Sequence, residues 1–332
     1  MAISTDMRIL VTGATGKVGQ HFIHRFLADD ARNGAVVRVL CHNRMLEEGS
    51  RLEVVRGSIA ERADVERAME GVTHVLHLAT CKETPEDVMD VTVKGLFWLL
   101  EACRHADAFE QFILIGGDAG MGHFVYPHPV PVTEMQGHSA YEGCYALSKV
   151  LEEVMLEQYY IQYNLNGCCL RAPWIMEKDD FKYSLSFGED VFGGPKWREL
   201  VGVEKADQFA AAGTVPLMLE AEGQPMRRNF VHVEDLVESV LAALDHPAAR
   251  QQLFNICMDE PVDYGKLAAY LERTRGLPHV EIRTPFHSTW LDNSKAKFLL
   301  EWRPQYDLAR LVESAWTYER GDDEPRKVWY PG

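Results

Sequence analysis

The chain has 332 residues, 46% of them hydrophobic and 25% charged, which is the composition of a globular protein with a substantial core. Its 34 basic and 50 acidic side chains give a formal net charge of −16, which argues against nucleic acid or an anionic membrane as a partner. Seven cysteines without a C-x-x-C pair, and no signal-peptide pattern or bilayer-length apolar run, predict a cytoplasmic protein with free thiols.

The first half of the chain alternates short apolar runs with helical patterns. Strands are expected at 8–12, 36–41, 52–56, 74–79, 111–115 and 167–171. Helices are expected at 18–28, 63–69, 86–105 and 145–163. This alternation predicts an α/β fold with a doubly wound parallel Rossmann sheet, whose ligands bind beyond the carboxyl ends of the strands.

The alternation of strand and helix patterns stops after residue 171, because residues 174–223 show no clear periodicity. Further elements are expected as helices at 233–244, 264–273 and 307–318 and a strand at 253–257. We therefore expect two domains. Residues 1–173 plus 228–258 would form the dinucleotide-binding Rossmann domain, and 174–227 plus 259–332 a smaller C-terminal substrate-binding domain.

Glycines at three-residue spacing follow the first expected strand directly, in Thr12-Gly13-Ala14-Thr15-Gly16-Lys17-Val18-Gly19. An amphipathic helical segment comes next. Strand, glycine turn and helix together bind a dinucleotide pyrophosphate, because glycines permit close backbone approach and the helix start presents free N–H groups. The order of these elements predicts a dinucleotide site here.

Tyr145 and Lys149 lie four residues apart, on one face of an expected helix. A lysine held beside a tyrosine favours the phenolate, which suits the phenol to general acid/base catalysis near neutral pH. The pattern alone is common on helices. Its place downstream of a glycine-rich dinucleotide turn makes the functional interpretation the stronger one.

With these motifs the chain resembles the extended short-chain dehydrogenase/reductases, the NAD-dependent epimerase/dehydratase group, over nearly its whole length. The resemblance rests on the glycine turn, His77-Leu78-Ala79, Tyr145 to Lys149, Leu170-Arg171 and the run from Arg228 to Asp235. Trp290 to Ala296 and Trp302-Arg303-Pro304 also fit the group's C-terminal pattern.

The resemblance implies that Tyr145 moves the hydroxyl proton during hydride transfer and that Lys149 holds the nicotinamide ribose. It also implies a homodimer formed through helices 86–105 and 145–163. The expected cofactor contacts are Gly13, Thr15, Gly16, Lys17, Val18, Asn43, Arg44, Ser58, Ile59, Leu78, Ala79, Thr80, Tyr145, Lys149 and Pro173.

Gly117 departs from the family pattern, which places a Ser or Thr hydroxyl after the fifth strand to polarise the substrate oxygen. Asp118, Ser139, His123, a backbone N–H or a water could replace that hydroxyl. Asp118 matches an aspartate of some dehydratases and is a candidate catalytic and substrate-binding residue. Because Ala119 stands where dehydration uses a glutamate, we do not expect dehydratase chemistry.

Cofactor choice depends on the end of the second strand, where Leu40-Cys41-His42-Asn43-Arg44 contains no carboxylate for the ribose hydroxyls of NAD. Arg44, with Lys17 from the turn, could bind a 2′-phosphate, because arginine recognises phosphate with paired donors. An exposed Arg44 with no such role is an equal alternative. The pattern favours NADP over NAD.

Arg228 and Arg283 are candidates for gripping a substrate diphosphate, with surface salt bridging as the alternative. Gly117 and His123 complete the expected substrate contacts. Three loop histidines, His123, His128 and His138, match no zinc spacing, so we expect no metal.

The sequence therefore predicts an NAD(P)-dependent sugar dehydrogenase or epimerase, whose substrate is a carbohydrate-like small molecule, either free or nucleotide-linked. Two alternatives stay open. One is a carbonyl reductase for an apolar ketone, which the arginine-bearing C-terminal part disfavours. The other, prompted by Gly117, is an NADP-sensing protein without turnover.

Overall fold

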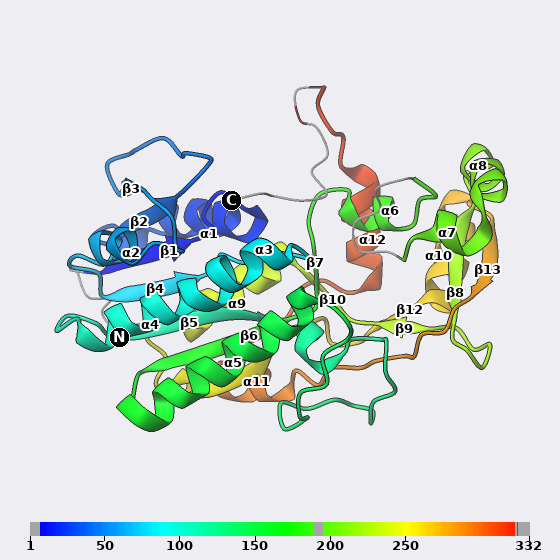
Figure 1. Cartoon of the computed structure of the whole chain (residues 1–332). Coiled ribbons are helices and arrows are strands. Elements are labelled where there is room, and N and C mark those ends of the chain that lie inside the picture. Colours follow the sequence, from blue (N-terminus) through cyan, green and yellow to red (C-terminus); the bar gives the residue numbers. More distant parts are fainter. Residues whose placement is uncertain (1–6, 189–194, 323, 325–332) are drawn as a thin grey trace.

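A seven-stranded parallel sheet forms the centre of the computed structural model, which describes residues 7–188, 195–322 and 324 (Figure 1). Its strand order is β11-β6-β5-β4-β1-β2-β3, and every pairing is parallel. The strands are β1 (Arg8–Thr12), β2 (Val36–Cys41), β3 (Leu52–Arg56), β4 (His74–His77), β5 (Gln111–Gly117), β6 (Gly167–Ala172) and β11 (Gln252–Asn255). The expected doubly wound α/β sheet is confirmed.

Helices cover both faces of this sheet, so its inner strands are buried along their whole length. On one face pack α1 (Lys17–Leu27), α9 (Val233–Ala243) and α11 (Ser294–Leu299). On the other pack α2 (Arg62–Ala68), α4 (Gly95–His105) and α5 (Cys144–Tyr163). The two cores hold the carboxyl ends of the strands in fixed relative positions.

Strand order reverses between β1 and β4, which lie side by side although they are separated in sequence by β2 and β3. At that reversal the Thr12 hydroxyl accepts hydrogen bonds from the backbone N–H groups of Leu78 and Ala79, each at 3.2 Å. Its own proton then goes to Nδ1 of His77, 2.8 Å away. The reversal is the place where open α/β sheets bind their ligands.

A second core lies beside the sheet, around Trp197, Phe181, Phe187, Phe230 and Tyr264. Its helices are α6 (Asp180–Ser184), α7 (Trp197–Val201), α8 (Val203–Ala211), α10 (Tyr264–Arg275) and α12 (Leu308–Thr317). Its strands form three pairs: β7 (Trp174–Met176) with β10 (Phe230–His232), β8 (Val215–Leu219) with β13 (His279–Arg283), and β9 (Arg227–Arg228) with β12 (Val262–Asp263). In Figure 1, α7, α8, α10, β8 and β13 gather on one side, away from the large sheet.

Three features differ from the sequence expectations. The helix expected at 86–105 is built from α3 (Pro85–Val88), a π-helical stretch at Met89–Lys94, and α4. Strands β8 and β13 and helix α8 were not expected. Residues 296–302, expected in the substrate domain, pack into the core of the large sheet, where the Trp302 indole donates to the Asp235 carbonyl at 3.0 Å.

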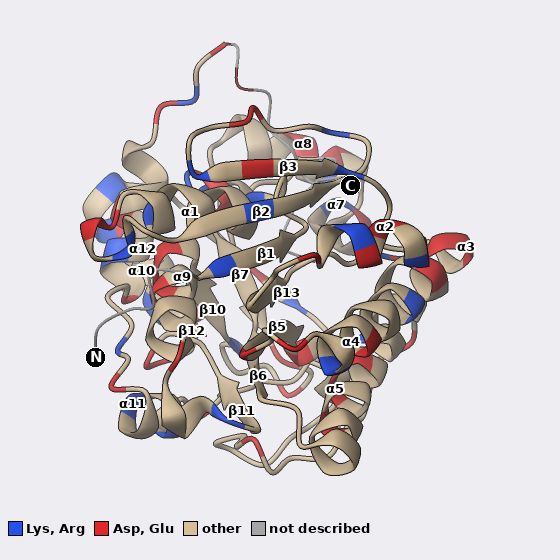
Figure 2. Cartoon of the chain, turned by 90° about the vertical axis from the view of Figure 1, so that its left-hand side faces the viewer, with Lys and Arg blue, Asp and Glu red and all other residues tan. Residues whose placement is uncertain are grey.

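Charged residues of both signs are interspersed along the ribbon (Figure 2). None of the helices in the described ranges is both long and apolar enough to span a bilayer.

Candidate active site

The glycine turn joins β1 to α1 and leaves no room for side chains. Gly13 has φ +66°, and a Cβ there would lie 2.8 Å from the backbone nitrogen of Ala79. A Cβ on Gly19 would lie 2.6 Å from Ala14, so α1 packs closely on the turn. The first turn of α1 contains no acidic residue, and Gly16 at its N-cap makes no side-chain cap. This cradle suits a pyrophosphate.

The other expected cofactor residues follow the carboxyl ends of neighbouring strands. Asn43 and Arg44 follow β2, Ser58 and Ile59 follow β3, and Leu78, Ala79 and Thr80 follow β4. Thr15 and Val18 belong to the glycine turn and the start of α1, and Pro173 separates β6 from β7. Parallel strands end at one edge of the sheet, so these residues lie along the carboxyl edge of the sheet.

Lys17 has a different environment from the one expected. Its ammonium forms an ion pair with Asp180 and donates to the carbonyl of Ile175 at 3.0 Å. In the structure this side chain links α1 to the segment after β7, and its contact with a 2′-phosphate stays a prediction. Arg44 remains as the basic side chain expected at the adenosine end.

Tyr145 and Lys149, in the first turns of α5, meet the end of β5. The Lys149 ammonium lies 5.6 Å from the centroid of the Tyr145 ring, and the Lys82 ammonium lies 4.0 Å from it. A Cβ built on Gly117 would be 3.7 Å from the Tyr145 hydroxyl and 3.6 Å from Cδ of Lys149. The pair and Gly117, predicted separately from sequence, thus share one site.

A buried carboxylate, Glu152, forms an ion pair with the lysine of this pair. Lys149 is 4% exposed, and its Nζ lies 2.7 Å from Oε2 of Glu152, which is 1% exposed. Burial opposes the charge of Lys149, yet the Glu152 carboxylate and the Tyr145 phenol raise the pKa of Lys149 above its usual value. Burial raises the pKa of the Glu152 carboxyl, against the opposing effect of Lys149.

A second buried cluster forms around Glu153, the residue that follows Glu152 on α5. Glu153 accepts from Nε and Nη2 of Arg171, at 2.9 and 2.6 Å, and lies 2.9 Å from Nε2 of His138. Although burial favours the neutral carboxyl, the Arg171 and His138 hydrogen bonds lower the pKa of Glu153. The cluster ties α5 to β6.

Asp118 and His123 form a third pair directly after Gly117. Nδ1 of His123 lies 2.6 Å from Oδ1 of Asp118, and both side chains are largely buried. The imidazole ring stacks on Tyr141, with centroids 5.2 Å apart, and on Trp174, at 6.2 Å. Ser139, another candidate, uses its hydroxyl to donate to the Met121 carbonyl at 2.8 Å. Polar groups therefore stand beside the glycine that lacks a hydroxyl.

The two candidate diphosphate arginines lie in unlike surroundings. Arg228 is 1% exposed and is enclosed by the rings of Phe124, Trp174 and Phe230, whose centroids lie 4.6 to 5.2 Å from its guanidinium carbon. Arg283 is exposed at the end of β13, beside the turn at Gly223.

Sequence reasoning missed Lys82, Glu83 and Glu152, and gave His77 no role. Glu83 accepts from the backbone N–H of Tyr145 at 3.3 Å and so caps α5. Burial, and then the charge of Lys149, lower the pKa of His77 to about 3. Glu152 had a usable signal, because a residue three positions after Lys149 shares its helix face. Lys82 and Glu83 had no such sequence signal, because the loop after β4, distant in sequence from α5, brings them to Tyr145.

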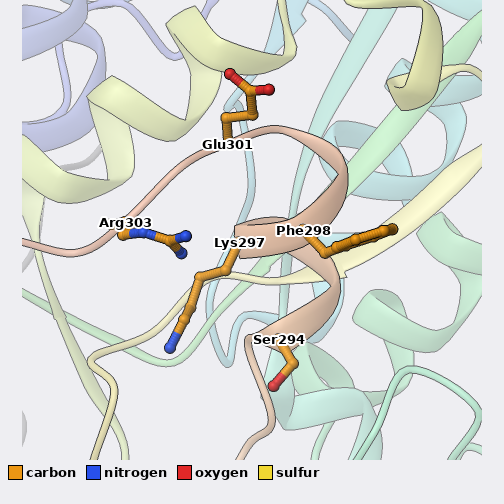
Figure 3. A pocket seen from close by; sticks show the side chains of 5 residues that line it. All are labelled: Ser294, Lys297, Phe298, Glu301 and Arg303. Carbon is orange, nitrogen blue, oxygen red and sulfur yellow. The ribbon is translucent and has the colours of Figure 1, made fainter.

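Two other features lie away from this site. Within the described ranges, one His and carboxylate cluster has ligand atoms within 4.8 Å of one another: His74, Glu110 and Asp245. It sits at the amino end of β4, and both ring nitrogens of His74 have protein partners, Asp245 at 2.7 Å and Thr73 at 2.8 Å. A surface hollow of about 500 Å³ is lined by residues of α11 and of the segment that follows it. There Phe298 points away from Lys297 and Arg303 (Figure 3).

Known proteins share this architecture. The chain is 27% identical to UDP-glucose 4-epimerase of Mycolicibacterium smegmatis, over 96% of this chain and 100% of that protein. It is 26% identical to UDP-glucuronate 4-epimerase 2 of Arabidopsis thaliana, over 80% of this chain, and spans 63% of that relative's length. A short-chain dehydrogenase/reductase superfamily protein from Agrobacterium tumefaciens, solved with bound NAD, superposes with a TM-score of 0.77 at 24% identity, over 94% of this chain and 96% of that one.

The family described as "NAD dependent epimerase/dehydratase family" matches residues 9–176, just over half of the chain. That range runs from the glycine turn through Tyr145 and Lys149 to β7. The chain therefore belongs to the NAD dependent epimerase/dehydratase family.

Proposed function

We propose that the protein is an NAD(P)-dependent oxidoreductase that acts on a secondary hydroxyl or ketone of a sugar, with Tyr145 as its general acid/base. One observation carries this proposal. The Tyr145 hydroxyl and the Lys149 side chain flank Gly117 at the carboxyl end of β5, in the sheet whose strand order reverses at the glycine turn. A dinucleotide bound along the turn would supply a nicotinamide that accepts or returns hydride.

The chain's own residues would handle the proton and orient the substrate. Tyr145 takes the proton of the substrate hydroxyl during oxidation and returns it during reduction. Lys149 supports the phenolate with its charge. The Asp118–His123 pair holds the substrate oxygen, because it is the polar group next to Gly117.

Nucleotide-sugar epimerisation is the more specific form of this proposal. It is favoured by the similarity to UDP-glucose and UDP-glucuronate 4-epimerases. Arg228 is the candidate diphosphate ligand, and contact with it requires the rings of Phe124 and Trp174 to move aside. A dehydrogenase for a free sugar needs no such movement. Nicotinamide that remains bound through purification would favour the epimerase.

For the cofactor, Arg44 favours NADP, since no carboxylate stands with it at the end of β2. The structural relative with bound NAD supports the alternative.

Exposed apolar residues on α4 and α5 support a homodimer. Leu147, Val154 and Ile161 are exposed at seven-residue intervals along α5, and Phe97 is exposed on α4. Such a stripe matches a helix-packing face. We place this dimer in the cytoplasm.

Replacing Tyr145 with Phe tests the proposal. A panel of free and UDP-linked sugars, assayed with NAD and NADP, first identifies a substrate. Tyr145→Phe should then lower kcat by about 10²- to 10⁴-fold, with a far smaller effect on cofactor affinity. Tyr159→Phe is a matched control, because that phenol is on the same helix but donates to Glu101. Undiminished turnover in Tyr145→Phe, or a wild type that binds cofactor and turns over nothing, would refute the proposal.

A further inference from the structure

The pairing of Lys149 with Glu152 calls for a functional explanation. Both side chains are almost fully buried, and their charged atoms are 2.7 Å apart. Burying an ion pair requires the desolvation of both ions, and well-packed apolar residues are often at least as stabilising. Fold stability alone is therefore a weak reason for a carboxylate at this position.

The neighbouring charges leave Glu152 as the group that balances Lys149. On α5 itself, Glu153 is already neutralised by Arg171 from β6. On β4, His77 is neutral, because burial holds its pKa at about 3. On β6, burial raises the pKa of Cys169 well above its usual value, so that thiol is neutral too.

The loop after β4 brings charges of both signs. It places the Lys82 ammonium 4.0 Å from the Tyr145 ring centroid, and the Glu83 carboxylate accepts from the backbone N–H of Tyr145. Two cations thus surround the phenol, and Glu152 is the buried anion in ion-pair contact with one of them.

We propose that Glu152 is a positioning residue that sets the pH at which the Tyr145–Lys149 pair releases its proton. It does so by holding the ammonium of Lys149 in place and by offsetting part of its charge. The inference rests on the acid/base role proposed above for Tyr145.

The sign follows from counting charges. With Glu152 ionised, the charges of the phenol, the ammonium and the carboxylate sum to zero before the pair loses a proton and to −1 afterwards. With glutamine at position 152, the net charge of the three side chains changes from +1 to zero. Burial penalises net charge, so the glutamine variant should release its proton at lower pH, whichever member of the pair loses it.

The test is an ultraviolet pH titration of phenolate absorbance in the cofactor-free protein. Each background, wild type and Glu152→Gln, is measured against its own Tyr145→Phe partner, so that the difference reports this phenol alone. Glutamine nearly keeps the shape of glutamate and can still accept from Lys149. We expect the midpoint to fall by about one pH unit, a tenfold change in proton affinity, and the acid limb of kcat/KM to move with it.

Glu152→Asp is the conservative control and should keep the midpoint within about 0.3 pH units, because the charge remains. An unchanged or higher midpoint in a folded Glu152→Gln protein would overturn the inference, even if kcat or thermal stability fell. The titration needs no substrate. If the midpoint shifts in Glu152→Gln but Tyr145→Phe leaves turnover unchanged, the proposed function is refuted and the electrostatic inference still holds.

Discussion

The carboxylate of Asp118 lies 2.6 Å from Nδ1 of His123, one residue beyond the glycine that replaces a family hydroxyl. Asp118 begins a short turn after β5, and the φ of +47° at His123 turns the chain back toward it. Stacking on Tyr141 and Trp174 holds the imidazole in one orientation. The pair is thus preorganised directly after Gly117, the residue that faces the Tyr145 hydroxyl.

His123→Ala should lower kcat/KM by about 100-fold, the usual effect of losing one preorganised donor to a substrate oxygen. Asp118→Asn should have a smaller effect, because the imidazole stays in place without its carboxylate. Cofactor affinity, measured by fluorescence titration, should not change in either variant. A His123→Ala enzyme with wild-type kcat/KM would remove this pair from the mechanism.

Gly117→Ser should partly rescue the His123→Ala enzyme. A Cβ at this position meets Lys149 and Tyr145 at ordinary contact distances, and φ of −146° suits any residue, so the change in unfolding free energy should be within about 0.5 kcal/mol. The new hydroxyl supplies a donor beside Tyr145, and we expect kcat to recover about tenfold. Gly117→Ala adds the carbon without the hydroxyl and should give no rescue. Equal recovery in both variants would contradict a hydrogen-bonding role.

Arg44→Ala should weaken NADP binding by about tenfold and leave NAD binding unchanged, because one arginine–phosphate contact is lost. Calorimetric titration of both cofactors against wild type and variant measures this directly. A wild type with clear preference for NAD would remove the assignment of Arg44 to a 2′-phosphate.

Replacing both Val154 and Ile161 with Arg should convert a dimer to a monomer, because charges would be buried in an apolar helix interface. Light scattering coupled to size-exclusion chromatography gives the mass. Phe298→Arg is the matched control, since this 83% exposed side chain lies on α11, which packs on the opposite face of the sheet from α4 and α5 (Figure 2). A monomeric wild type would refute the dimer.

His77 should make the protein sensitive to acid. Its pKa falls from 6.5 to about 3, mainly through burial, so the folded state resists a proton that the unfolded chain accepts. The stability it contributes is fully present above pH 6.5 and is lost as the pH falls toward 3, by on the order of 4 kcal/mol. His77→Gln should flatten this part of the unfolding free energy profile, whereas His24→Gln, on the exposed face of α1, should not. An equally steep profile in His77→Gln would contradict this assignment.

Patterns within short segments predicted much of the fold and part of the site. Apolar runs alternating with helical periods placed the seven parallel strands to within two residues, because helices on both faces bury the inner strands of the sheet. The second half was harder to predict. Strands β8 and β13 pair although more than 50 residues separate them, and the partner of each is invisible in the other's local sequence.

The sequence by itself determined the glycine cradle, the Tyr145–Lys149 pair and the missing hydroxyl at Gly117. Each depends on neighbours along the chain, and helix and strand periods convert such spacing into geometry. Tertiary structure alone decided that Lys17 pairs with Asp180, 163 residues away, and that aromatic rings enclose Arg228. Burial and charge pairing depend on which distant segments pack together, and no local pattern encodes that choice.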